Sequence, residues 1–163
     1  MVEKSKLGQF KEKYAVLEKK YDLPKYEELN ENFHIDKAAD TETDIPIIEI
    51  RKYVADKMAG YLRFAETLLN PSNAPMFIFS IVKTLTPEDK KNLTEIYKVL
   101  AKNEFNLIKT DIYFSEEKEA KFIIESYKIW KEIKKDILGI LQSVEDKWDN
   151  KLERSEERRV GKE

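Results

Sequence analysis

The chain has 163 residues, of which 38% are charged and 41% hydrophobic, and its formal net charge is −2. This length allows one domain with a core, and the presence of only 4 glycines and 5 prolines favours long helices over a β-sandwich or barrel. The absence of cysteine excludes disulfides, thiolate metal sites and cysteine nucleophiles, and the small net charge gives no general attraction to nucleic acid or anionic lipid.

The first predicted helix covers residues 4–21. Its apolar residues follow one another at steps of three and four: Leu7, Phe10, Tyr14, Leu17 and Tyr21. This coiled-coil-like seam is only two heptads long, which is too short to predict a coiled coil. Pro24 ends the helix, a short helix is expected near residues 25–30, and the polar stretch 36–44 predicts a loop.

A second long helix is predicted over residues 45–69, with Asp44 as its cap and Pro46 in its first turn. Prolines and asparagines between residues 70 and 75 predict a rigid loop. The apolar run that follows fits a helix or a strand. Because no other strand is predicted for it to pair with, we predict a short buried helix over residues 76–84.

The third long helix is predicted over residues 87–113, since Thr86 is a capping residue and Pro87 suits the first helical position. Its predicted buried face consists of Leu93, Ile96, Tyr97, Leu100, Leu107, Ile108 and Ile112. Ser115 then caps the last helix. Because the connection is only a residue or two long, these two helices are expected to be antiparallel neighbours.

The last helix, predicted over residues 115–152, is the longest and would run roughly 55 Å. It is expected to extend beyond the second helix, and the overhang carries Val144, Trp148 and Leu152. These apolar side chains need cover from the first helix or from another chain. They are therefore our candidate partner surface.

The predicted fold is all-α: an antiparallel bundle of four main helices with one or two short extra helices, forming a single domain over residues 1–153. Residues 154–163 read Arg-Ser-Glu-Glu-Arg-Arg-Val-Gly-Lys-Glu. This tail resembles a translated sequencing adapter, so we interpret it as non-native and give it no function.

Motifs for common chemistries are missing. His34 is the only histidine, whereas di-iron and di-manganese bundles need Glu-x-x-His on two helices. The four isolated glycines exclude a P-loop and a dinucleotide-binding fingerprint. Glu104 and Asp111 could share a hard cation, but pairing with water or with a lysine such as Lys109 is the favoured interpretation. We therefore predict no catalytic, cofactor-binding or metal-binding residues.

Three lysines, Lys128, Lys131 and Lys135, share one face of the last helix and could contact a phosphate backbone. Glu125 and Glu132 interleave with them, which is typical of a solvated, ion-paired helix face. Nucleic-acid binding is therefore the alternative function and not the leading one.

The pattern Leu-Pro-x-Tyr-Glu-Glu-Leu-Asn at residues 23–30, the helix ending in Asn-Pro-Ser-Asn and the long Trp-containing helix resemble small uncharacterised helical proteins of archaea. The resemblance covers most of residues 23–149 and implies no activity. The apolar runs are too short for a membrane span, and we expect a cytoplasmic protein. The leading hypothesis is a non-enzymatic protein that acts through helix–helix contacts, either with a protein partner or with itself as a homodimer.

Overall fold

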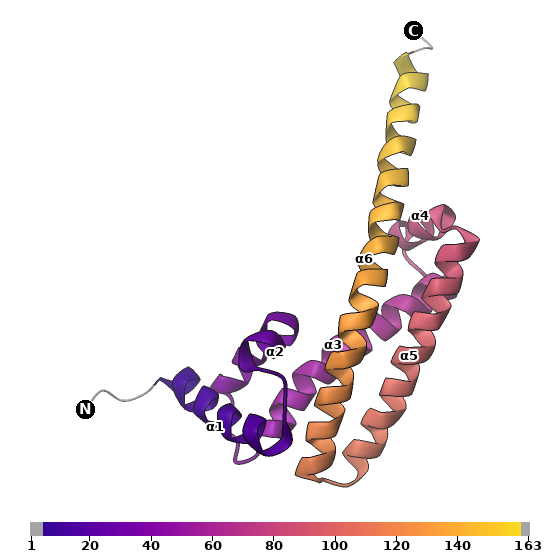
Figure 1. Cartoon of the computed structure of the whole chain (residues 1–163). Coiled ribbons are helices and arrows are strands. Elements are labelled where there is room, and N and C mark those ends of the chain that lie inside the picture. The colour runs from indigo at the N-terminus through magenta and orange to yellow at the C-terminus, as the bar shows by residue number, and fades with distance from the viewer. Residues whose placement is uncertain (1–4, 161–163) are drawn as a thin grey trace. The chain divides into compact units, whose positions relative to one another are not determined.

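The computed structural model describes the backbone of residues 5–160 and the side chains of residues 5–150 and 154. Over this range the chain forms α1 (Lys6–Tyr21), α2 (Tyr26–Phe33), the 3₁₀ helix η1 (Ile35–Asp40), α3 (Pro46–Leu69), α4 (Met76–Thr84), α5 (Pro87–Ile112) and α6 (Glu116–Val160), as Figure 1 shows. The described residues form no strand, so the all-α prediction is confirmed.

The helices form two compact units. The first unit comprises Met1–Tyr61 and Leu100–Trp130, and the second comprises Leu62–Val99 and Lys131–Glu163. Helices α3, α5 and α6 each contribute residues to both. The predicted arrangement as a single four-helix bundle over residues 1–153 therefore stays a prediction.

Most helix boundaries match the sequence prediction, with two corrections. The stretch 36–44 is not a loop throughout, because residues 35–40 form η1. Helix α6 does not end at residue 152 but continues to Val160. Polar sequence predicted a loop in the first case, but Ile35 and Ala38 are buried and hold this segment in a helical turn.

The starts of α5 and α6 follow the expected capping chemistry. Thr86 Oγ1 accepts a hydrogen bond from the backbone N–H of Asp89 at 3.0 Å, and Asp89 Oδ2 accepts one from the N–H of Thr86 at 3.0 Å. This reciprocal pair is a capping box, which satisfies two N–H groups that the helix cannot pair itself. At the start of α6, Ser115 Oγ accepts from the N–H of Lys118 at 3.4 Å.

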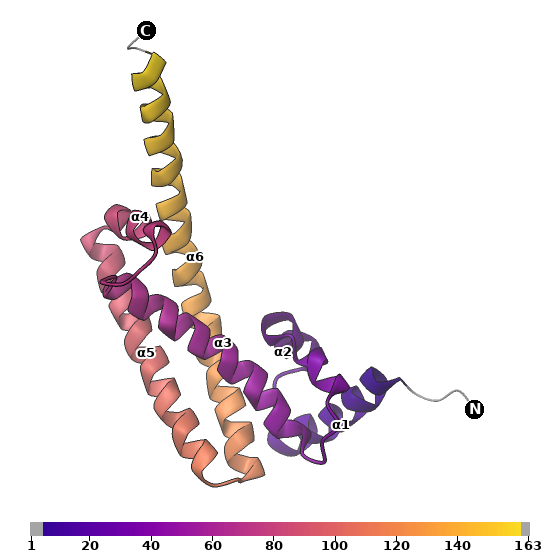
Figure 2. The ribbon, with the colours of Figure 1, turned by 180° about the vertical axis from the view of Figure 1, so that it is seen from behind.

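In the first unit, α5 and α6 lie side by side and run in opposite directions, joined by a short turn at residues 113–115 (Figure 1 and Figure 2). A buried bond crosses this pair, because Asn103 Nδ2 donates to Ser126 Oγ at 2.9 Å. Trp130 of α6 donates its indole N–H to Asn32 Oδ1 at 3.0 Å. The fully buried side chains of this unit include Tyr14, Leu29, Ile35, Ile47, Ile50, Met58 and Ile123.

In the second unit, α4 is helical as predicted but is not buried as predicted. Met76, Phe77 and Phe79 are exposed, and Ile81 is the buried residue of this helix. A helix of only two turns has one face toward its neighbours, so a sequence that is apolar all round leaves large side chains outside. The buried residues of this unit include Ala65, Leu68, Leu93, Ile133, Ile137, Ile140 and Val144.

Candidate protein-contact surface

The predicted partner surface is only partly available in the structure. Val144 is buried, and Trp148 is half-buried with its ring centroid 6.1 Å from that of Phe77. Both rings belong to the second unit, so α4 supplies cover that the sequence analysis assigned to the first helix or to another chain. Leu152 lies outside the residues whose side chains the structure describes.

The predicted phosphate-contacting residues, Lys128, Lys131 and Lys135, are all exposed on α6. Their exposure is what a phosphate-binding face and a solvated helix face both require. The acidic residues Glu132 and Asp136 are exposed on the same stretch of helix. The lysines are thus interspersed with carboxylates, which weakens the local positive potential.

Asp111 joins a cluster of charges in the first unit. Arg51 of α3 donates from Nε to Glu119 Oε2 at 2.7 Å and from Nη2 to Asp111 Oδ1 at 3.2 Å. The side chain of Glu119 is 1% exposed, whereas that of Asp111 is 71% exposed. Burial alone would lower the pKa of Arg51, but the hydrogen bonds and charges of Glu119 and Asp111 raise it above its ordinary value.

This cluster corrects one sequence interpretation. The expected partner of Asp111 was water or a lysine such as Lys109, but the partner is Arg51, which is distant in sequence. Glu104 forms no ion pair with any residue whose side chain is described. Those residues also contain no group of three or more histidine, aspartate or glutamate side chains placed to hold a metal ion.

His34 has a structural position at the end of α2. Its backbone φ is 55°, in the left-handed region, and its N–H donates to the carbonyl of Asn30 at 2.8 Å. This residue therefore closes the helix, with its side chain exposed.

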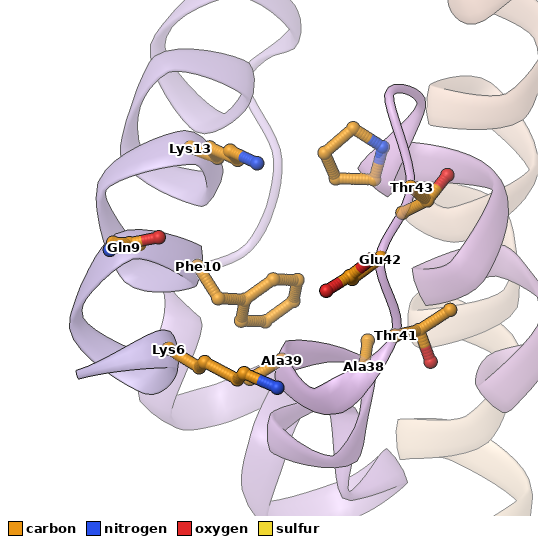
Figure 3. Close-up of a pocket in the computed structure, with 10 residues that line it drawn as sticks. Lys6, Gln9, Phe10, Lys13, Ala38, Ala39, Thr41, Glu42 and Thr43 are labelled. Atoms are coloured by element: carbon orange, nitrogen blue, oxygen red, sulfur yellow. The ribbon is translucent and has the colours of Figure 1, made fainter.

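One pocket of the first unit, lined by helical and loop residues, is small. It has a volume of about 160 Å³ and lies between α1, η1 and the loop that follows. Figure 3 shows the Phe10 ring among Lys6, Lys13 and Glu42, whose charged side chains are exposed. A shallow pocket with solvated charges around one ring lacks the convergent, desolvated polar groups typical of catalytic sites.

A second set of large apolar side chains lies on the surface of the first unit. We name it the α5 apolar face, and it consists of Phe105 (65% exposed), Ile108 (53%), Ile112 (65%), Tyr113 (74%) and Phe114 (54%). The sequence analysis placed Ile108 and Ile112 in the core, and that prediction is wrong. It also missed the other three residues.

The position of this face on the helix explains the error. Phe105, Ile108 and Ile112 follow at steps of three and four, so they share one side of α5. The residues of the first unit that α5 buries, Leu100, Asn103 and Thr110, point to roughly the opposite side. Helix α5 thus has two stripes, and the buried one contains two polar residues. Apolar periodicity alone therefore assigns Ile108 and Ile112 of the exposed stripe to the core.

Charged residues border the α5 apolar face in an ordered way. At 100° per residue, Lys102 and Lys109 fall along one edge, and Glu104 and Asp111 fall along the other. Lys102 and Lys109 are exposed, and neither forms an ion pair with a described side chain. An apolar stripe with a cationic edge and an anionic edge is the pattern of a helix that packs against another helix.

Comparison with known proteins gives no independent assignment: no family model, no curated protein and no solved structure matches the chain. In the part of the chain that the structure describes, none of the helices is long and apolar enough to cross a membrane.

Proposed function

We propose that this chain is a non-enzymatic helical protein that acts by binding a protein surface through the α5 apolar face. The observation that carries the proposal is the exposure of Phe105, Ile108 and Ile112 on the side of α5 that faces away from its buried stripe. Two further exposed aromatic residues, Tyr113 and Phe114, follow Ile112 directly in the turn.

The size of the face supports this function. Large aromatic side chains have roughly 150–250 Å² of surface, so five side chains exposed by half to three quarters present on the order of 600 Å². Phe105, Ile108 and Ile112, which share one side of α5, account for about half of this area. That half lies within the size range of the largest apolar patch on a typical monomeric protein, and such patches are often interaction sites.

The proposal is tested with a photo-crosslinking residue at position 108 in cells that make the chain. We expect a discrete adduct with a protein, identified by mass spectrometry, because the face would be covered by its partner. The matched control carries the crosslinker at Val16, which is 68% exposed in the same unit but lies on a different helix, α1. Adding Phe105→Gln and Ile112→Gln to the position-108 chain should abolish the adduct. No adduct at position 108, or the same adducts at both positions, would refute the proposal.

Nucleic-acid binding through Lys128, Lys131 and Lys135 is the alternative proposal. Each of the three lysines is exposed on α6, which this function requires. A gel shift at low salt with DNA and with RNA tests it. If these lysines bind phosphates, the chain should retard the nucleic acid, and the affinity should fall steeply as the salt concentration rises. Nucleic acid that migrates unretarded at low salt would end this alternative.

A further inference from the structure

We propose that the partner of the α5 apolar face is the same face of a second copy of the chain, with the two α5 helices parallel. This inference rests on the proposed function, because it names the partner of the surface described above.

The spacing of the face fits a two-helix contact. Phe105 and Ile112 fall at equivalent positions seven residues apart, and Ile108 lies between them at steps of three and four. Ala101 extends the same pattern by one further position and is half-buried. Two helices with such stripes pack side chains of one into the gaps of the other at a shallow crossing angle.

The area is sufficient for a dimer at the small end of the range. A stable interface of ordinary size buries about 800 Å² on each partner. The apolar side chains supply on the order of 600 Å², and the bordering Lys102, Glu104 and Lys109 side chains can contribute the remainder. A second copy would therefore cover the α5 apolar face together with its charged edges.

The edge charges select the relative direction of the helices. In a parallel pair, a residue on one edge faces the residue five positions later on the opposite edge of the partner helix. Glu104 then faces Lys109 of the second copy, and two-fold symmetry makes this contact twice. In an antiparallel pair, each edge faces itself, so Lys102 meets Lys109 and Glu104 meets Asp111. Parallel packing thus pairs opposite charges where antiparallel packing would oppose like charges.

The turn after α5 favours the same direction. Tyr113 and Phe114 are exposed directly after the last helical residue, Ile112. In a parallel pair both turns lie at the same end of the interface, so these aromatic side chains can cover one another. In an antiparallel pair the turns lie at opposite ends of the interface, so these rings cannot cover one another. Burial of the rings adds to the driving force for the parallel pair.

The test uses sedimentation velocity of the purified full-length chain, from low micromolar to near-millimolar concentration. Reversing one edge charge, with Lys109→Glu or with Glu104→Lys, should weaken dimerisation on the order of tenfold, because like charges then face each other twice. The double variant Glu104→Lys/Lys109→Glu restores the opposite-charge contacts and should recover the dimer. Lys19→Glu, an exposed lysine on α1, is the control for net charge and should leave dimerisation unchanged. Circular dichroism of each variant confirms that the helices are intact.

The outcomes separate this inference from the proposed function. Single reversals that tighten the dimer indicate antiparallel packing and overturn the inference. A chain that stays monomeric at every concentration also overturns it. If the position-108 crosslinker then still captures a different protein, the proposed function holds while the partner is not a second copy. Loss of dimerisation in both single variants with recovery in the double variant supports the inference, because only the parallel contact gives that pattern.

Discussion

Arg51 should be the residue of the first unit whose charge matters most for stability. Replacing it with methionine keeps an unbranched, apolar stem but removes the guanidinium that contacts Glu119 at 2.7 Å. The carboxylate of Glu119, only 1% exposed, is then left without a cation. Removing one partner of a buried ion pair costs about 3–5 kcal/mol, so we expect Arg51→Met to lower the free energy of unfolding by that amount.

The contribution of Asp111 to this loss should be small. Its side chain is 71% exposed, and exposed ion pairs contribute about 0–1 kcal/mol. The buried contact with Glu119 therefore determines the magnitude. Replacing both buried partners, with Arg51→Met/Glu119→Leu, removes the stranded charge and should recover most of the lost stability. The matched control is Lys52→Met, an exposed cation on the same helix and in the same unit, which should change stability by less than about 0.5 kcal/mol.

The measurement is urea unfolding followed by Trp130 fluorescence in a Trp148→Phe background, because Trp130 is the tryptophan of the first unit. A loss of less than about 1 kcal/mol in Arg51→Met would contradict the expectation for a buried pair. So would a double variant that is no more stable than Arg51→Met, because the penalty is assigned to the uncompensated Glu119 charge.

Two further predictions concern polar contacts of the first unit. Ser126→Ala should cost about 1–3 kcal/mol, because it leaves the buried amide of Asn103 without its acceptor, while Asn103→Leu/Ser126→Ala should be closer to wild type in the same unfolding assay. The pKa of Glu116 is lowered from its ordinary value of 4.5 by the hydrogen bond from Tyr21, at 2.5 Å, and then by that from Lys20. A carboxyl group whose pKa is lowered in the folded state stabilises the fold at pH values above its ordinary pKa. This stabilisation is lost as the pH falls below the ordinary pKa and through the lowered one. Thermal melts across acidic pH should therefore show a shallower loss of stability in Glu116→Gln than in wild type, and parallel curves would count against this contact.

The sequence predicted the helices well because their signals are local. Thr86 caps its helix as predicted, and the run from residue 76 to 84 is helical as predicted. Both results depend on residues within a few positions of each other. The partners of Arg51 and Trp130 are distant in sequence, at separations of 68 residues to Glu119 and 98 residues to Asn32. Such pairs leave no periodic signal in a single sequence.

The candidate surface could not be predicted for a different reason. Periodicity shows that Ile108 and Ile112 share a side of the helix with Phe105, but it does not show which stripe faces the core. The buried stripe of α5 includes Asn103 and Thr110, so hydrophobicity alone ranks the exposed stripe at least as high. Asn103 is accommodated inside because Ser126 accepts its hydrogen bond, and that partner becomes visible only when α5 and α6 are placed side by side. The buried polar residue Asn103 and the exposed apolar residues of α5 thus have one cause, namely which side of α5 packs against the rest of the unit.

Asp111 connects the internal ion cluster to the α5 apolar face. Its carboxylate lies on the acidic edge of that face and is contacted by Arg51, so part of its charge is compensated within the same chain. Glu104 has no such partner among the described side chains, and neither has Lys109. The pair that would decide the direction of a second helix, Glu104 and Lys109, therefore consists of edge residues that, like Lys102, form no ion pair with a described side chain. A surface selected only for contact with water would gain nothing from this arrangement, since both residues could be solvated equally well beside any polar neighbour.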